Sequence, residues 1–530
     1  MQFQDSKAFE RLKKLAEKPL DFTHSGVLTP ERILSLRTEA VGLEILYATE
    51  RVCANTLEAL FSLASEMGAH EKMVAMQTGE KINSIIGYPS ENRSVLHTAM
   101  RDLFDHPQTT PLASEASSQA RKELEKLKAF LHQVDSKKKF TTLVQVGIGG
   151  SELGPKAIYL ALKAYAKQGR AVHFISNVDP DETAQVMREV DLKKTLFVVV
   201  SKSGNTLETE TNEALVRHYL KKAGLDSTKQ VIAVTGEGSP MDDPKRYLAS
   251  FYIWDYVGGR YSASSMVGAV ALCFALGFEQ FSDFLKGAHA MDQVALKEKG
   301  VKNLPLLTAL LGIWNRNFLH LPTSAIIPYS QALSRFPAHL QQLEMESNGK
   351  RIDRSGHPVS FETGAIIWGE PGTNGQHSFF QLIHQGTTPI PLEIIGFKQS
   401  QYGEDLSFQE SSSQEKLISN FFAQALALAI GQKSDNPNKV FPGNRPSRII
   451  LAERLDPHTM GALLSLYEHQ VAFQGFIWDI NSFDQEGVQL GKRLAVQFIE
   501  QFIHKNRGEP FNRSQFSLGV SFLETISHLA

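Results

Sequence analysis

Hydrophobic and polar residues alternate with different periods in different parts of this 530-residue chain. In residues 1–115, apolar residues recur at spacings of three and four, as in LRTEAVGLEILYATERV and TLEALFSLASEM. This period predicts amphipathic helices. From residue 116, short runs rich in β-branched residues alternate with amphipathic helical segments. We therefore expect a helical N-terminal arm followed by an α/β region.

Eight short apolar runs predict the strands of the α/β region. Strands that are apolar at almost every position, and that are separated by helices, are typical of parallel sheets covered on both faces. The runs fall into two groups along the chain. The first group is TTLVQVG, VHFISNV, TLFVVVS and QVIAVTG, and the second is SAIIPYS, AIIWGE, PLEIIGF and RIILAERL.

The grouping of the strands predicts the domain organisation. Two doubly wound α/β domains are expected in tandem, over residues 116–288 and 289–506. The helical arm, 1–115, precedes them, and a C-terminal arm, 507–530, follows. The longest apolar run, MVGAVALCFALGF, is shorter than the ~20 residues that span a bilayer, so it predicts a buried core helix.

Charge and cysteine content narrow the function classes. The net charge is −2, the sequence pI is about 6.8 and no long basic stripe is present, so a nucleic-acid partner is not expected. The two cysteines, Cys53 and Cys273, form no CxxC pair, which disfavours a zinc site or a disulfide framework and favours the reducing cytoplasm. The N-terminal stretch MQFQDSKAFERLKKLAEK lacks the pattern of a secretory signal. We expect a cytoplasmic protein with no membrane partner.

A glycine-rich turn, VGIGGSELGP, follows the first strand of the first domain. Gly150 lets a ligand approach the backbone, and Ser151 adds a hydroxyl near a helix start, where free N–H groups favour an anion. The dinucleotide fingerprint GxGxxG is not completed, because Glu152 occupies the third glycine position. The alternative is a tight turn that binds no ligand.

A second turn, VVVSKSGNTLETET, is richer in hydrogen-bond donors. Ser201, Lys202, Ser203 and Thr206 follow a strand and precede a helix that should begin near Glu208. Such donors suit phosphate oxygens. A Walker GxxxxGK[ST] loop is absent, so a single phosphoryl group is favoured over a nucleoside triphosphate. The alternative is a cluster of helix-capping residues.

Two further segments carry charged candidates. WDYVGGRYSASSMVG presents Arg260, which could stabilise an oxyanion or pair with a structural carboxylate. QLEMESNGK places Gln342 and Glu346 four residues apart on one helical face, while Glu344 points elsewhere. Glu346 could act as a base, although acids at helix ends are usually solvated.

The remaining candidates lie nearer the C-terminus. WGEPGTNGQHSFFQLIHQGT places His377 in the first turn of a helix as a candidate proton carrier, and His384 is expected to be structural. NSFDQEGVQLGKRLA contains Gln485 and Lys492, with Lys492 one to two turns into a helix. The alternative for Lys492 is a surface lysine whose stem covers apolar surface.

Taken together, these motifs resemble the glucose-6-phosphate isomerase, or phosphoglucose isomerase, family. WDYVGGRYSASSMVG and FDQEGVQLGK look like its two signature segments. GIGGSELGP, SKSGNT, MESNGK and GTNGQHSFFQLIHQGT fit the same family in the same order, and GEKINS and ENRSVLHTAMR match its N-terminal arm. The resemblance runs from about Gly79 to Lys492.

The resemblance implies two sugar-isomerase domains, each a doubly wound parallel-sheet sandwich, and a homodimer with shared active sites. It implies an aldose–ketose isomerase of glycolysis and gluconeogenesis that interconverts glucose 6-phosphate and fructose 6-phosphate. The reaction would pass through ring opening and a cis-enediol, and would need no metal and no cofactor.

The resemblance also implies residue roles. Glu346 is the base, His377 of the partner subunit opens the ring with help from Lys492, and Arg260 stabilises charge. One departure is visible, because the family commonly has Glu where Gln489 stands, which leaves the detailed role of Lys492 open. The implied sugar-phosphate contacts are Gly150, Ser151, Ser201, Lys202, Ser203 and Thr206, and further substrate contacts are Gln342 and Gln485.

Two other function classes compete with an isomerase. A non-catalytic sugar-phosphate sensor of the same fold would use the same hydroxyl-rich turns, but would need no Glu, His and Lys set and would usually carry a DNA-binding domain. A Rossmann-type dehydrogenase would need the dinucleotide fingerprint that the glycine-rich turn does not complete. An activity assay on fructose 6-phosphate separates the isomerase from the sensor, and absence of nicotinamide binding in a fluorescence titration would dismiss the dehydrogenase.

Overall fold

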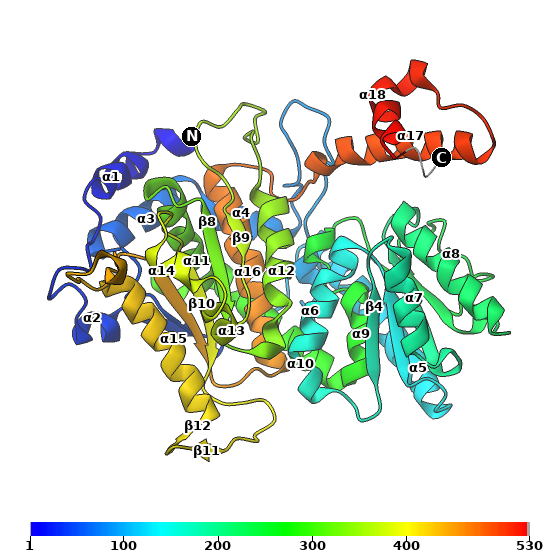
Figure 1. Cartoon of the computed structure of the whole chain (residues 1–530), viewed down its shortest axis with the longest axis horizontal. Helices are drawn as coiled ribbons and strands as arrows, with labels where there is room; N and C mark the ends of the chain where they lie inside the picture. The colour runs from blue at the N-terminus through cyan, green and yellow to red at the C-terminus, as the bar shows by residue number, and fades with distance from the viewer. Residues whose placement is uncertain (1, 527–530) are drawn as a thin grey trace. The chain divides into compact units, whose positions relative to one another are not determined.

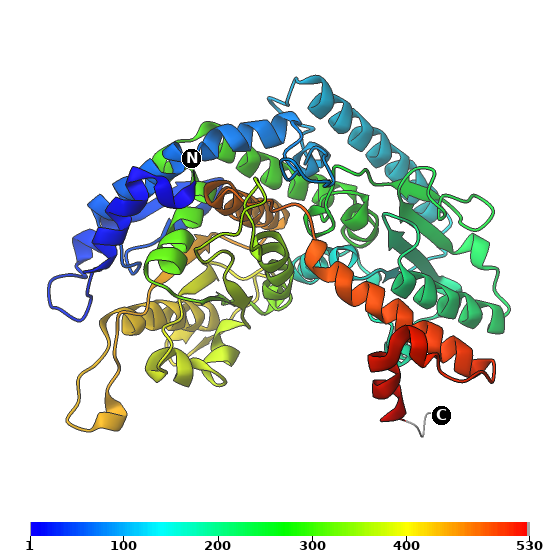
Figure 2. The same cartoon turned by 90° about the horizontal axis from the view of Figure 1, so that it is seen from above.

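The computed structural model describes residues 2–526 and confirms the α/β class. The chain divides into two compact units after Ser482. Two separate sheets lie in different parts of the first unit, each surrounded by helices (Figures 1 and 2).

The first sheet has five parallel strands in the order β4-β3-β5-β6-β7. Phe197 and Val199 pack with residues of α7 and α8, whereas Val198 between them is buried on the opposite face, where α9 contacts the sheet. Both faces are therefore covered, as expected for a doubly wound domain. The elements are β3 (Thr142–Val146), β4 (Ala171–Ile175), β5 (Thr195–Ser201), β6 (Val231–Thr235), β7 (Ser250–Tyr252), α5 (Pro111–Ser136), α6 (Leu153–Ala161), α7 (Pro180–Glu189), α8 (Leu207–Lys222) and α9 (Met266–Leu276).

The second sheet has six strands in the order β1-β2-β13-β10-β8-β9. Strands β13, β10, β8 and β9 are parallel, while β2 pairs antiparallel with β13 and β1 pairs antiparallel with β2. The eight predicted strands are all present across the two sheets. The bounds are β1 (Arg37–Ala40), β2 (Leu43–Leu46), β8 (Thr323–Pro328), β9 (Ile366–Trp368), β10 (Leu392–Phe397) and β13 (Ser447–Ala452).

The N-terminal arm is not wholly helical, so that expectation is wrong for residues 37–46. This segment forms the β1–β2 hairpin at the edge of the second sheet. Val41 and Gly42 make its two-residue turn with φ of 54° and 72°, as a tight hairpin with two left-handed residues requires. The residues of β2 alternate between buried and half-buried. The alternation at every second residue covers only these four positions, and the surrounding sequence has the spacing of three and four that is typical of a helix.

Helices fill the rest of the first unit. The apolar run from Met266 forms α9, and every residue of that helix is buried, as predicted. The long helix α16 contacts both α10 and α11. The helices are α1 (Lys7–Ala16), α2 (Pro30–Ser35), α3 (Ala54–Glu66), α4 (Ala69–Thr78), α10 (Phe278–Lys297), α11 (Leu304–Ile313), α12 (Phe336–Gln341), α13 (Gly372–Gln376), α14 (Phe380–Gln385), α15 (Ser413–Ile430) and α16 (Pro457–Trp478), with a small hairpin of β11 (Ser407–Phe408) and β12 (Ser411–Ser412).

The second unit begins at Phe483 and contains α17 (Gln489–Asn506) and α18 (Arg513–Glu524). These two helices contact each other, and Phe498 meets Phe516 edge to face with ring centroids 4.8 Å apart. The division of the chain at residues 115, 288 and 506 stays a prediction.

Candidate active site

The two donor-rich turns lie side by side at one edge of the first sheet. Strands β3 and β5 are parallel neighbours, with Val146 paired to Val199, so the chain leaves both strands at the same edge. A Cβ atom on Gly147 would lie 3.3 Å from Cβ of Val200. The turns after Val146 and Ser201 therefore face a common space beyond the carboxyl ends of the strands.

The hydroxyl-rich turn is held by its own side chains. Ser201 is buried, and its Oγ lies 2.9 Å from Oγ1 of Thr206 and accepts a hydrogen bond from the Gly204 N–H at 3.2 Å. Thr206 is the residue before α8, yet its side chain makes no capping hydrogen bond, and Ser203 is exposed. The hydroxyls of Ser201 and Thr206 thus face each other instead of capping the helix.

Lys202 connects this turn to the segment that carries Arg260. Its Nζ donates to the carbonyl of Val257 at 3.1 Å and to that of Asp255 at 3.4 Å. Burial, together with the nearby positive charge of Arg93, lowers the pKa of Lys202 to about 8. The lysine is therefore a partly desolvated cation near the strand edge.

The glycine-rich turn packs against two other segments at very short range. A Cβ atom on Gly150 would lie 2.1 Å from the carbonyl oxygen of Gly259, so only glycine fits there. Gly149 has φ of 60°, and a Cβ atom on it would lie 3.3 Å from Nε2 of Gln342. Ser151 ends this turn, and α6 starts at Leu153. The structure thus brings together turns that are separated by more than a hundred residues.

Arg260 is the most strongly anchored candidate. The residue is only 2% exposed. Its Nε donates to Oγ of Ser347 at 2.6 Å, and its Nη2 donates to the carbonyl of Ser482 at 2.7 Å. Nη1 lies 3.5 Å from Oε1 of Glu346. These contacts fix the plane of the guanidinium and turn one edge of it toward the candidate base.

Glu346 is neither buried nor fully solvated. It ends the π-helical turn Gln342–Glu346, and its side chain is 23% exposed. π-Helical turns are frequent at functional sites. Gln342 lies beside Gly149 and Glu346 beside Arg260, so the two residues point to the same group of turns, as their spacing predicts. The carboxylate is therefore accessible and sits next to a buried cation.

Comparisons with known proteins decide the family. A model described as phosphoglucose isomerase matches residues 46–518. The chain belongs to the phosphoglucose isomerase family. Glucose-6-phosphate isomerase of Protochlamydia amoebophila is 58% identical over 524 residues, which cover 99% of this chain and 97% of that protein, and that of Desulfotalea psychrophila is 53% identical over 513 residues, covering 95% and 96%. The crystal structure of a glucose-6-phosphate isomerase from Chlamydia trachomatis superposes with a TM-score of 0.95 at 49% identity over the whole of both chains.

The structure corrects the local setting of His377. The residues GTNGQ themselves form α13, and His377 follows this helix as its C-cap, so the prediction of a first-turn position is wrong. The side chain is exposed and makes no hydrogen bond or ion pair within residues 2–526. His384 is structural as expected, because its Nε2 lies 2.7 Å from Oε1 of Gln424.

Gln485 and Lys492 belong to the second compact unit. Gln485 precedes a short 3₁₀ turn, and Lys492 lies in the first turn of α17. Gln489 begins this helix, so it is three residues before Lys492 on a helical surface. The roles that the phosphoglucose isomerase resemblance implies for Gln485 and Lys492 stay predictions.

Sequence reasoning missed the residues that hold Arg260 in place. Ser347 is fully buried, and its Oγ contacts both Arg260 and the hydroxyl of Tyr261, at 3.0 Å. Asn348 is also fully buried, and its Oδ1 accepts a hydrogen bond from Oγ of Ser482 at 2.7 Å. The family motif MESNGK contains both, but no periodicity rule identifies a serine or asparagine as buried.

Residues 2–526 offer neither a metal-binding cluster nor a membrane-spanning helix. No group of three or more His, Cys, Asp and Glu side chains is arranged to hold a metal ion. No helix in this range is both long and apolar enough to cross a membrane.

Proposed function

We propose that this chain is an aldose–ketose isomerase that interconverts glucose 6-phosphate and fructose 6-phosphate. The observation that carries the proposal is the pair formed by Glu346 and the buried Arg260, 3.5 Å apart, beside the donor-rich turns of the first sheet. A carboxylate next to a fixed guanidinium is suited to removing a proton from carbon and stabilising the oxyanion that results.

The phosphate group would bind at the carboxyl edge of the first sheet. Side-chain hydroxyls and free N–H groups there offer many donors with little net charge, which suits a phosphoryl group. Binding at this remote group positions the reacting carbons. The proposed contacts are Gly150, Ser151, Ser201, Lys202, Ser203 and Thr206.

The proton transfers need a single carboxylate. Glu346 would take the proton from carbon 2 of the open-chain aldose. The electron pair of that bond would form the double bond between carbons 1 and 2, and the π pair of the aldehyde would move to the oxygen of carbon 1, so that the cis-enediol forms with negative charge at that oxygen. Arg260 would stabilise this charge. A proton would pass from the oxygen of carbon 2 to that of carbon 1, and Glu346 would return its proton to carbon 1 as the carbonyl forms at carbon 2. A positioned base of this kind typically contributes ~10²–10⁴-fold to the rate.

Ring opening would require further residues. The ring oxygen must gain a proton and the anomeric hydroxyl must lose one, and His377 with Lys492 would share this work. Gln342 and Gln485 would contact the sugar. Gln342 has its amide next to Gly149, which supports that placement.

We further propose a homodimer in which His377 comes from the partner subunit. His377 is exposed, and its side chain makes no hydrogen bond or ion pair within residues 2–526. Three exposed apolar residues, Phe422, Leu426 and Ile430, are spaced four apart on α15 and form a stripe that a partner could cover.

A hybrid experiment tests the shared site. Glu346→Gln and His377→Ala variants are each expected to be inactive, but dimers mixed from both contain one site with both native residues. Random mixing should then restore about one quarter of wild-type activity. No recovery after verified subunit exchange would show that His377 acts within its own chain or not at all.

The same proposal assigns the chain to the cytoplasm, to glycolysis and gluconeogenesis, and to catalysis without a cofactor or metal. Cys53 and Cys273 are both unpaired, which supports a reducing location. The decisive experiment is a coupled assay on fructose 6-phosphate with purified protein, with and without chelator. Conversion that survives chelation is expected. No conversion would favour a sensor, and loss of activity that a divalent ion restores would favour a metal-dependent isomerase.

A further inference from the structure

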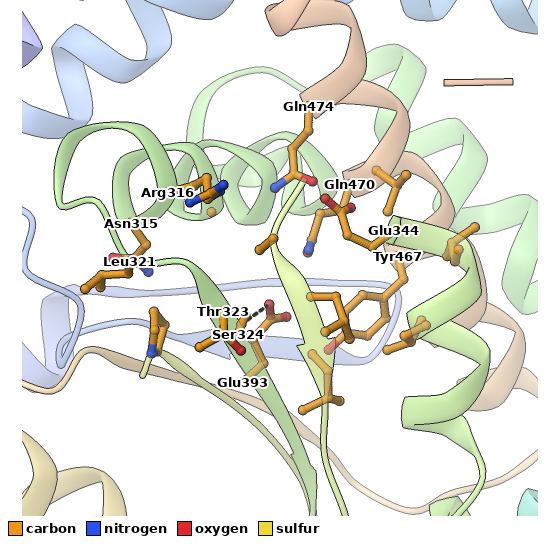
Figure 3. A pocket seen from close by; sticks show the side chains of 18 of the residues that line it. Asn315, Arg316, Leu321, Thr323, Ser324, Glu344, Glu393, Tyr467, Gln470 and Gln474 are labelled. Carbon is orange, nitrogen blue, oxygen red and sulfur yellow. Dashed lines mark hydrogen bonds between the residues drawn. The ribbon is translucent and has the colours of Figure 1, made fainter. Parts of the chain in front are cut away.

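A second carboxyl group in the π-helical turn faces away from the candidate site. Glu344 is 6% exposed and borders a cavity of about 40 Å³ between the second sheet and α16. Figure 3 shows the side chains of Glu344, Gln470 and Gln474 turned toward the same space. Neither Glu346 nor Arg260 lines this cavity, so it is separate from the candidate site.

The cavity is lined by acceptor oxygens that lack donors. Oε1 of Gln470, Oε1 of Gln474 and Oδ1 of Asn315 have no hydrogen-bond partner within residues 2–526, and all three residues are at least nine-tenths buried. Leaving a buried acceptor unpaired costs ~1–3 kcal/mol, so such atoms are normally satisfied. A buried water molecule needs ~10–15 Å³ of cavity volume, so a cavity of about 40 Å³ has room for about three.

The electrostatic surroundings favour a protonated Glu344. Burial raises the pKa of Glu344 to about 8, and the negative charge of Glu393 acts in the same direction. Hydrogen bonds from the Asn348 side chain and from the backbone N–H of Ala365 oppose both effects. The other charged or titratable side chains that line the cavity are Arg316, Arg448 and Tyr467.

These neighbours do not supply Glu344 with a counter-charge. Arg448 is paired with two other carboxylates, with Glu393 at 2.6 Å and Glu50 at 3.1 Å. Arg316 directs its Nε to the carbonyl of Thr363. A neutral carboxylic acid also supplies an O–H donor, which a wall of acceptor oxygens requires and an ionised carboxylate could not provide.

A short chain of hydrogen bonds connects this cavity with Arg260. Nδ2 of Asn348 donates to Oε2 of Glu344 at 3.2 Å, and Oδ1 of Asn348 accepts from Oγ of Ser482 at 2.7 Å. The carbonyl of Ser482 in turn accepts from Nη2 of Arg260. Ser347, next to Asn348, accepts from Nε of the same guanidinium. The side chain of Asn348 thus links Glu344 at the cavity to Ser482, and Asn348 is also next in sequence to Ser347. Ser482 and Ser347 are the two residues that accept hydrogen bonds from Arg260.

We propose that the cavity binds two or three ordered water molecules and that Glu344, with these waters, is a positioning residue that orients Asn348 and through it Arg260. The inference rests on the proposed function, in which Arg260 stabilises the enediol. Glu344 touches no substrate and acts through the side chain of Asn348 and through the waters to which its O–H donates.

Two substitutions separate the positioning role from a general packing role. Glu344→Gln keeps a neutral donor and acceptor, so kcat and KM at pH 7 should stay within about twofold of wild type. Glu344→Leu removes one of the two acceptors of the Asn348 amide and leaves only the carbonyl of Val471 at 3.1 Å, so it should lower kcat by about tenfold with a smaller change in KM. Glu125→Leu, on the exposed surface of α5, is the matched control and should change neither parameter. Equal kcat values for Glu344→Leu and wild type would overturn the positioning role.

The pH profile gives a readout that a packing role would not move. Ionisation of Glu344 would remove its donor, so the wild-type kcat should fall as pH rises past about 8, and the fall should be absent in Glu344→Gln. A kcat profile that is identical in the two proteins would contradict the proposal.

Two further measurements do not depend on activity. Infrared spectra at pH 7 should show a protonated-carboxyl band that Glu344→Gln lacks, and a crystal structure should show water bonded to Gln470 and Gln474. An absent band or a dry cavity would overturn the inference, even if Glu344→Leu fails to fold. Retained turnover in Glu346→Gln would instead refute the proposed function, so the two failures are distinguishable.

Discussion

The two sheets of the first unit place their polar groups in different positions. In the first sheet, the donor-rich side chains gather at the carboxyl ends of β3 and β5, where Ser201 is the last residue of β5 and Lys202 follows it. In the second sheet, Ser324, Glu393 and Arg448 lie within β8, β10 and β13, and they are directed at the cavity that α16 covers. The same parallel architecture therefore provides an open edge in one domain and a buried polar interior in the other.

This difference suggests a division of work between the domains. The turns of the first domain offer donors to a ligand at the point where open parallel sheets usually bind one. The segment between β8 and β9 of the second sheet supplies Glu346, and the polar interior lies directly behind that segment. We expect substitutions at the carboxyl edge of the first sheet to change turnover or substrate binding, and substitutions of the residue that directly follows a strand at the corresponding edge of the second sheet, such as Lys398, to change stability at most.

The largest expected effect is that of Glu346→Gln. If Glu346 is the base that moves the proton between carbons, the amide removes the proton acceptor and turnover should fall by ~10³-fold or more. Substrate binding should remain largely intact, because the amide has the same shape. The coupled assay and a direct binding titration with fructose 6-phosphate measure the two effects.

Glu344→Gln is the control for this comparison, because the same replacement is made two residues earlier in the same π-helical turn. Near-normal turnover is expected there. Full activity in a mass-verified Glu346→Gln protein would remove Glu346 from the mechanism and would leave Arg260 without the partner proposed here.

The strands could be predicted because each has a local apolar pattern. The proximity of the two donor-rich turns could be predicted because they follow neighbouring parallel strands of one sheet. All eight predicted strands formed, and parallel neighbours necessarily bring the turns after Val146 and Ser201 together. The β1–β2 hairpin was missed because its two strands are only four residues each, too short to outweigh a helix-like period.

The support of the site could not be predicted in the same way. Glu344 is buried against α16 and the second sheet, Ser347 is buried against Arg260 and Tyr261, and Asn348 bonds Val471 and Ser482. Apart from the second sheet, these partners are distant in sequence. No local pattern separates such residues from a solvated polar stretch. Likewise, His377 follows a helix because the residues GTNGQ form the helix α13. The two glycines in GTNGQ disfavour a helix, so the sequence predicted that the helix would begin after them.

Arg260→Lys should produce the second largest effect. An ammonium group cannot bond Ser347 and Ser482 and also face Glu346, so kcat should fall by ~10²-fold, with KM changed less. The matched control is Arg445→Lys, a buried arginine of the second domain that donates to the carbonyl of Gly386. Reduced thermal stability with normal kcat is expected for the control. Loss of turnover in both variants would show that the effect of Arg260 is merely structural.

Lys202→Ala tests the two sheet edges against each other. Lys202 directly follows β5, and Lys398 directly follows β10. Lys398 is exposed, however, and its Nζ lies 3.6 Å from Oε2 of Glu453. KM for fructose 6-phosphate should rise by about tenfold in Lys202→Ala, because a charged hydrogen bond to the phosphate would be lost. Lys398→Ala should leave KM unchanged, and an equal rise in both variants would remove the distinction between the edges.

The pH dependence of KM sharpens the same test. With its pKa lowered to about 8, Lys202 is charged below that pH and loses its charge as the pH rises through it. KM should therefore increase on the alkaline side in the wild type, whereas a guanidinium remains charged, so the increase should be absent in Lys202→Arg. An alkaline rise in KM that persists in Lys202→Arg would assign it to another group.

The smallest expected effect concerns the hairpin that only the second sheet possesses. Val41 is β-branched and has φ of 54°, a left-handed conformation that costs such a residue ~1–2 kcal/mol. Val41→Asn would create the Asn-Gly pair preferred in tight hairpins and should raise the free energy of unfolding by about 1 kcal/mol without changing kcat. Thr38→Asn, in the extended part of β1, should bring no gain. If Val41→Asn does not raise the midpoint of thermal unfolding, the β1–β2 hairpin unfolds separately from the rest of the second sheet. The hairpin would then be less stable than the buried centre of that sheet.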